Sequence, residues 1–215
     1  MFPRLYAIID ASLLSGSELP KNDSGLAIAQ MLANSGVELI QYRDKRSNSR
    51  QYYEVSLQFA QALASTPARF IVNDRPDIAL LTGAAGVHVG QTDLSVEDAR
   101  AICGVDRWVG VSTHNLEQLR EADKTSANYI AFGPVFATAT KQNPDPVVGL
   151  EHLREARRLT RKPLVAIGGM TLDRAAEVYA AGADSICVAR DLMRSPDPAA
   201  SARAYLRIAS EAARP

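Results

Sequence analysis

The sequence predicts an α/β protein, a (β/α)8 TIM barrel built as a single domain by residues 1–215. Short apolar runs rich in β-forming residues alternate with helical segments along the whole chain, and eight such units occur. No change in composition divides the chain, whose length suits one ordinary domain. Eight units favour a closed barrel over an open Rossmann-like sheet, and no Gly-x-Gly-x-x-Gly follows the first strand.

The elements are expected in strict strand–helix order. The strands are predicted over 5–9, 38–41, 69–72, 86–89, 108–111, 129–132, 164–167 and 185–188. The helices are predicted over 25–34, 49–64, 76–81, from 95, 115–123, 150–159, 172–180 and 198–212. The strands are continuous apolar runs, as expected for a parallel sheet covered by helices. Ser95 followed by Asp98 is close to a capping box, and Asn115 is a suitable N-cap.

Composition limits the classes of partner. Lys plus Arg number 24 and Asp plus Glu number 24, so the formal net charge is zero, which argues against a nucleic-acid partner. No apolar run approaches the roughly 18 residues of a membrane span, and the N-terminus does not resemble a signal peptide. Cys103 and Cys187 are expected to be free structural thiols. We therefore expect a cytoplasmic protein with small-molecule partners.

The second strand ends in a charged run that suits a pyrophosphate. In a barrel, polar residues at the C-terminal ends of the strands face the active-site mouth. The run is Gln41, Tyr42, Arg43, Asp44 and Lys45. Alternation places Gln41, Arg43 and Lys45 on one side, which combines an amide with two cations. A charged surface loop is the alternative interpretation.

The next strand ends offer two carboxylates. Asn73 and Asp74 follow strand three, and Asp93 follows strand four. Carboxylates at neighbouring strand ends suit Mg2+, which binds few carboxylates together with phosphate oxygens and water. Each aspartate is equally placed to cap the helix that follows it. Ser112, after strand five, suits either a substrate ring or a helix cap, and His88 is expected to be a core residue.

The last three strand ends suit a phosphate group. The Pro/Gly-rich segment 133–148, which carries Thr138, Thr140 and Lys141, is long enough to close over a ligand. Gly168 and Gly169 follow strand seven, and Ala189 and Arg190 follow strand eight. Backbone N–H groups at these two positions form a recurrent phosphate site in barrels.

Taken in order, these motifs resemble the thiamine phosphate synthase family. The set comprises Gln41-x-Arg43-x-Lys45, Asn73-Asp74, Gly90-Gln91-x-Asp93, Ser112, Thr138-x-Thr140-Lys141 and Gly168-Gly169. The resemblance implies a TIM-barrel transferase that joins hydroxymethylpyrimidine pyrophosphate to thiazole phosphate. The reaction releases pyrophosphate and requires Mg2+. A homodimer is the one assembly considered.

The resemblance also implies a division of the site residues. The pyrimidine pyrophosphate would be held by Gln41, Arg43, Lys45, Asn73, Ser112 and Lys141, within a binding region that includes Tyr42 and Asp44. The thiazole phosphate would be held by Thr138, Ala139, Thr140, Gly169, Ala189 and Arg190, and Mg2+ by Asp74 and Asp93. Two positions depart from the family: Arg190 stands where Ser is usual, and Tyr42, expected to point away from the site, where an aliphatic residue is common.

Two other functions are considered. The first is a thiazole tautomerase-like isomerase on the same barrel, whose members tend to lose the metal carboxylates and the pyrophosphate cations. The second is a non-catalytic barrel that binds a phosphorylated ligand. Because Asp74, Asp93, Arg43, Lys45 and Lys141 are all present, the synthase is favoured over both.

Overall fold

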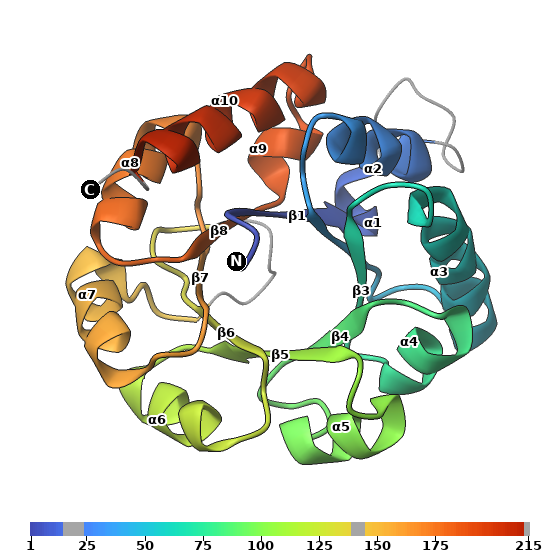
Figure 1. The fold of residues 1–215 in the computed structure, drawn as a ribbon, viewed down its shortest axis with the longest axis horizontal. Coiled ribbons are helices and arrows are strands. Elements are labelled where there is room, and N and C mark those ends of the chain that lie inside the picture. The colour runs from blue at the N-terminus through green and yellow to red at the C-terminus, as the bar shows by residue number, and fades with distance from the viewer. Residues whose placement is uncertain (15–23, 139–144, 213–215) are drawn as a thin grey trace.

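The predicted barrel is confirmed by the computed structural model, which describes residues 1–14, 24–138 and 145–212. Eight parallel strands pair in chain order, and β8 pairs with β1 to close the barrel. Figure 1 looks along the barrel and shows the helices as an outer ring around the strands.

The strands lie where the apolar runs predict them, with ends shifted by one or two residues. They are β1 Leu5–Asp10, β2 Leu39–Arg43, β3 Arg69–Asn73, β4 Gly86–Val89, β5 Trp108–Thr113, β6 Tyr129–Phe132, β7 Leu164–Ile167 and β8 Ser185–Val188. The longer helices are α2 Ser24–Asn34, α3 Ser49–Leu63, α4 Pro76–Thr82, α5 Val96–Cys103, α6 Leu116–Lys124, α7 Gly149–Leu159, α8 Leu172–Ala180 and α10 Pro198–Ala212.

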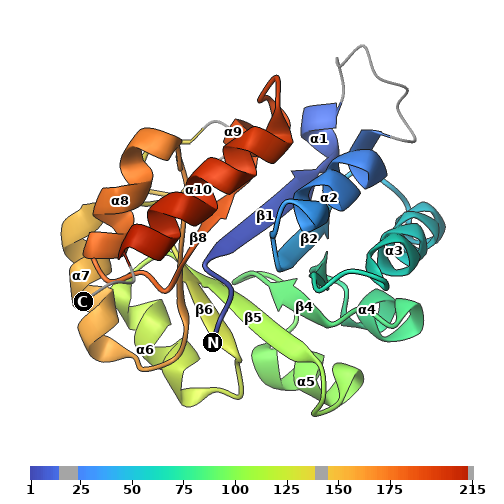
Figure 2. The ribbon, with the colours of Figure 1, turned by 45° about the horizontal axis from the view of Figure 1, so that its top comes forward.

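Two short helices were not predicted, α1 Ala11–Leu14 and α9 Arg190–Met193. Each has only four residues and lies within one residue of the end of its strand. A helix of four residues is too short to show a helical period in the sequence. They contact each other, and Figure 2 shows them together at the end of the barrel toward which the arrow of β1 points. Both short helices therefore lie at the C-terminal ends of the strands, where barrel active sites are found.

Strand alternation divides the buried side chains into two layers. Leu5, Ala7 and Ile9 of β1 pack outward against the helices, while Tyr6 and Ile8 belong to a separate cluster inside the barrel. Both faces of each strand are thus covered, which accounts for the continuous apolar runs in the sequence.

The N-terminal end of the barrel is closed by aromatic rings. Phe2 stacks on Trp108 with ring centroids 5.3 Å apart, and the Tyr129 ring packs against both of them inside the barrel. A Cβ atom at Gly110 would come within 2.1 Å of the Tyr129 ring, so glycine is required there for the ring to fit. This end is sealed, and a ligand must enter from the opposite end.

The predicted helix caps are confirmed. The Ser95 hydroxyl accepts a hydrogen bond from the Asp98 amide at 3.1 Å, and Asn115 accepts one from the Gln118 amide at 2.9 Å. Both cysteines are free and buried, and burial raises the pKa of each thiol. Within the described ranges, no helix is long and apolar enough to cross a membrane.

Candidate active site

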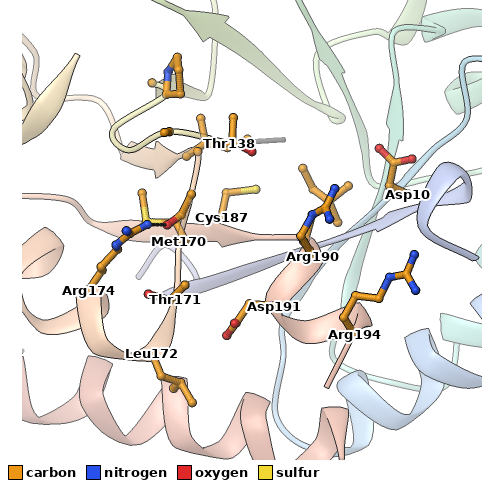
Figure 3. A pocket seen from close by; sticks show the side chains of 18 of the residues that line it. Asp10, Thr138, Met170, Thr171, Leu172, Arg174, Cys187, Arg190, Asp191 and Arg194 are labelled. Atoms are coloured by element: carbon orange, nitrogen blue, oxygen red, sulfur yellow. Dashed lines mark hydrogen bonds between the residues drawn. The ribbon is translucent and has the colours of Figure 1, made fainter. Parts of the chain in front are cut away.

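A cavity of about 650 Å³ opens among the C-terminal ends of the strands. Of the predicted site residues, it is lined by Arg43, Ser112, Thr138, Gly169, Ala189 and Arg190. Figure 3 shows that Arg174, Met170 and Thr171 border it on one side. Arg190 of α9 and Arg194, which follows α9, border it on another. The volume is within the range of small-molecule sites.

Arg43 is held in place by a buried carboxylate. Its guanidinium donates to Asp10 Oδ2 at 2.6 Å, and Asp10 is only 1% exposed. The other oxygen of Asp10 accepts from the Ser12 amide and hydroxyl, at 2.8 and 2.5 Å. Because the carboxylate is fully bonded, it fixes the guanidinium at the mouth of the barrel.

Two members of the charged run do not face the cavity. The Tyr42 ring stacks on Phe59, outside the barrel, with centroids 4.7 Å apart. Asp44 organises its own loop, because its carboxylate accepts from the amides of Arg46 and Ser47 and from the Ser47 hydroxyl. The Tyr42 and Asp44 side chains therefore support the loop, and Tyr42 points outward as alternation predicts.

Asp74 and Asp93 lie together, as their strand ends predict. Burial and the neighbouring Asp93 carboxylate raise the pKa of Asp74, against the opposing effect of Lys45. The Lys45 ammonium pairs with Asp74 Oδ2. Neither aspartate caps a helix, because no side chain caps α4 and Ser95 caps α5. This overturns the capping alternative for both.

The backbone at Asp74 is unusual. Its φ is +61°, the one positive value outside glycine among the described residues. Asp tolerates this left-handed conformation better than most residues, yet it still costs about 1 kcal/mol or more. Asp93 is held by the Gly90 amide, which donates to its carboxylate at 2.8 Å. The two carboxylates are thus held close enough to interact with each other.

Asn73 presents a buried donor without a protein partner. Its side chain is 6% exposed, and its Nδ2 atom has no hydrogen-bond partner among the described residues. The backbone N–H of Asn73 donates to the Tyr52 hydroxyl at 3.0 Å, which fixes the end of β3 against α3. A buried unsatisfied donor is costly unless a ligand completes it.

A hydrogen-bonded chain crosses the barrel interior. Gln41 Nε2 donates to the Tyr6 hydroxyl at 2.6 Å. The Tyr6 and Tyr129 hydroxyl oxygens lie 3.0 Å apart. His88 Nδ1 lies 3.1 Å from the Tyr129 hydroxyl oxygen, and His88 Nε2 lies 2.9 Å from Ser112 Oγ. His88 is therefore a satisfied core histidine, as predicted, but it also connects the two predicted site residues Gln41 and Ser112.

The opposite side of the mouth is lined mainly by backbone. Gly168 and Gly169 have φ of +98° and +63°, and a Cβ at Gly169 would come within 2.5 Å of the Ala137 carbonyl oxygen. Arg174 donates to the Gly169 carbonyl at 2.5 Å while its guanidinium lies over the Phe136 ring. Of the predicted residues on this side, Ala139, Thr140 and Lys141 lie outside the described residues.

Several cavity residues were not predicted from the sequence. Among them are the charged or titratable residues Asp10, His114, Asp145, Arg174, Asp191 and Arg194. Asp10 could have been predicted as a site residue, because it is a carboxylate at the C-terminal end of the first strand. His114 pairs with Asp145 at 3.4 Å across the mouth, a contact that depends on how a long segment folds back.

The closed barrel, with a cavity and charged or glycine-rich residues at the C-terminal ends of its strands, places the chain in the class of (β/α)8 barrels that carry a small-molecule site at that end. Comparison with known proteins narrows this class. Residues 5–192 match the family model described as thiamine monophosphate synthase. The chain belongs to the thiamine monophosphate synthase family, so the predicted family and transferase class are confirmed.

Individual relatives support the assignment to this family. The chain is 48% identical over 199 residues to a thiamine-phosphate synthase of Koribacter versatilis, covering 93% of each chain. It is 37% identical to that of Shouchella clausii, covering 97% of each. A solved thiamine phosphate pyrophosphorylase from Pyrococcus furiosus superposes with a TM-score of 0.84 at 33% identity, covering 98% of this chain and 97% of that one.

Proposed function

We propose that this chain condenses hydroxymethylpyrimidine pyrophosphate with thiazole phosphate to give thiamine phosphate and pyrophosphate. The observation that carries the proposal is that two groups of residues suited to phosphate lie at the same, C-terminal end of one closed barrel, where the cavity opens. One is cationic and acidic, at the ends of β2 to β4, and contains Arg43, Lys45, Asp74 and Asp93. The other is the glycine backbone after β7. Two phosphorylated reactants would then meet between them.

The chain's own residues assist the departure of pyrophosphate. The C–O bond to the pyrimidine methylene breaks, and both electrons leave with the pyrophosphate. Arg43 and Lys45 neutralise the charge that develops on it. Asp10 keeps Arg43 in position, and the unpartnered Nδ2 of Asn73 supplies a further donor. The thiazole nitrogen then forms the new C–N bond to the methylene carbon, so no protein nucleophile is needed.

The remaining groups position the two reactants. Ser112, fixed by His88, is placed to hydrogen-bond the pyrimidine ring. Gly169 lets the backbone approach the thiazole phosphate, and Arg174 holds that turn in place. Positioning two bound reactants contributes much of the rate enhancement in reactions of this kind.

Asp74 and Asp93 fit Mg2+. Burial, and after it the neighbouring Asp93 carboxylate, raises the pKa of Asp74, and a divalent cation beside the two carboxylates would offset both effects. The described residues hold no group of three or more His, Cys, Asp or Glu that could bind a metal, so substrate phosphate oxygens and water would complete the coordination. When bound, Mg2+ would neutralise charge on the leaving pyrophosphate.

The proposal is tested with purified protein, both substrates and Mg2+, by measuring thiamine phosphate and pyrophosphate together. Equal amounts of the two products are expected. No product with either Mg2+ or Mn2+ would rule the synthase out. A variant carrying Asp74→Asn and Asp93→Asn should lose activity while keeping its fold. Full activity in that variant would remove the metal assignment but leave the reaction in place.

A further inference from the structure

The cavity continues past the glycine backbone toward the start of α10. Beyond Gly168 and Gly169 it is lined by Arg190, Arg194, Ser195, Pro196 and Ser201. A single phosphate bound by the glycine backbone does not account for this extension.

Helix α9 is fixed so that Arg190, its first residue, and Arg194, which follows its last residue, face this extension. The Asp10 amide donates to Met193 Sδ at 3.2 Å, which ties α9 to β1. The Tyr205 hydroxyl donates to Asp191 Oδ2 at 2.6 Å, which ties it to α10. Figure 3 shows Arg190 and Arg194 extending from one side of α9 while Asp191 points away from them.

One cation on the thiazole side of the cavity is available to a ligand. Asp191 accepts from Tyr205, Asp145 faces His114, and Arg174 is engaged by the Gly169 carbonyl. The Arg194 guanidinium lines the cavity and has no hydrogen-bond or ion-pair partner among the residues that the structure describes. Arg194 follows the last residue of α9, and its backbone amide donates to the Arg190 carbonyl at 2.9 Å. The two arginines therefore start from neighbouring positions and can contact one anion together.

We propose that Arg190 and Arg194 form a second anion subsite, which binds the outer phosphate of a diphosphate ester whose inner phosphate lies at Gly169. The ligand class is the diphosphate of the same alcohol that the glycine backbone takes as a monophosphate. Such a compound would occupy the thiazole side of the mouth and compete with the reaction. The inference rests on the proposed function, because that function places the inner phosphate.

The Ser195 and Ser201 hydroxyls close the far end of the subsite. Their oxygens lie 2.8 Å apart, and both residues line the cavity. A phosphate oxygen could accept a hydrogen bond from one of these hydroxyls while the guanidinium groups neutralise its charge.

The experiment measures binding of thiamine monophosphate and thiamine diphosphate by calorimetry, without divalent cations. The wild-type chain should bind the diphosphate roughly tenfold more tightly, the size of one charge-assisted hydrogen bond. Arg194→Ala should remove most of this preference, and the variant with both Arg190→Ala and Arg194→Ala should remove all of it. Arg194→Lys should keep part of the preference for the diphosphate, because it retains the positive charge.

Arg203→Ala is the matched control, because it removes the same charge from an exposed position on α10. It should keep the tenfold preference. Equal or weaker binding of the diphosphate by the wild-type chain, with monophosphate binding and turnover intact, would overturn this inference alone. Preference retained in the double variant would also overturn it. If neither ester bound and no product formed, the proposed function would fail together with the inference.

Discussion

Asp10 shows how one buried carboxylate determines the geometry of a cation at the mouth. It is 1% exposed, it bonds Arg43 with one oxygen, and its other oxygen accepts from Ser12. Removing one partner of a buried ion pair leaves the other charge uncompensated.

Asp10→Ala should lower the free energy of unfolding by about 3 kcal/mol and raise KM for the pyrimidine substrate, because Arg43 loses its anchor. Urea denaturation and steady-state kinetics measure the two effects. Asp106→Ala, which removes an exposed carboxylate, should change stability by less than about 0.5 kcal/mol. Equal effects of the two substitutions would contradict the anchoring role.

Gly169 combines a left-handed backbone with a close backbone contact. Gly169→Ala should destabilise the protein by roughly 2–3 kcal/mol and weaken binding of the thiazole phosphate. Gly149→Ala is the control, since Gly149 also has a positive φ but nothing lies within 4 Å of the added Cβ. That variant should lose only about 1 kcal/mol. Denaturation measures the cost of backbone strain, and the KM for thiazole phosphate measures the loss of binding.

Helix α3 supports the pyrophosphate side through one hydroxyl. The Tyr52 hydroxyl accepts a hydrogen bond from the Asn73 backbone amide, and its oxygen lies 3.1 Å from the Tyr42 carbonyl oxygen. It therefore links the ends of β2 and β3. This link places the run from Gln41 to Lys45 beside Asp74.

Tyr52→Phe should therefore cost about 2 kcal/mol of stability, because the buried Asn73 N–H loses its acceptor. It should also raise KM for the pyrimidine substrate more than KM for the thiazole substrate. Tyr53→Phe is a neighbouring control whose hydroxyl makes no hydrogen bond within the described part of the chain. If both variants behaved alike in stability and in the two KM values, the link would have no functional role.

The elements were predictable from the sequence to the extent that periodicity determines them. Eight apolar runs predicted eight strands, and Ser95 and Asn115 predicted two helix starts. The short helices α1 and α9 were missed because four residues cannot show a period. The left-handed Asp74 was also missed, since its conformation depends on the neighbouring strand, whose His88 carbonyl accepts the Asp74 amide at 2.8 Å.

The site was predictable where it depends on strand ends alone. Parallel strands bring their ends together, so the sequence order of Asp74 and Asp93 was enough to pair them. The partners of Arg43 and Gln41 could not be predicted in the same way. They depend on strand register and on which side chains meet inside a closed barrel, which a linear pattern does not contain.

At the scale of the whole molecule, the sealed N-terminal end keeps the barrel interior out of water. Phe2→Ala should lower Tm by roughly 2–4 °C, because it removes the ring that stacks on Trp108. Phe2→Leu should recover about half of the loss by restoring apolar contact without stacking. Trp108 is the single tryptophan, so its fluorescence reports the change directly. An unchanged Tm in Phe2→Ala would show that the seal does not contribute to stability.

The chain from Gln41 to Ser112 has a polarity that the tautomer of His88 determines. Gln41 Nε2 donates to the Tyr6 hydroxyl, but each tyrosine oxygen can accept twice, so this bond fixes only the first link. With the His88 proton on Nε2, that nitrogen donates to Ser112 Oγ, and the Ser112 proton is left to point into the cavity. With the proton on Nδ1, Ser112 donates to Nε2 and presents its lone pairs to the cavity. The tautomer of one histidine inside the barrel thus determines whether the serine at a strand end meets its ligand as a donor or as an acceptor.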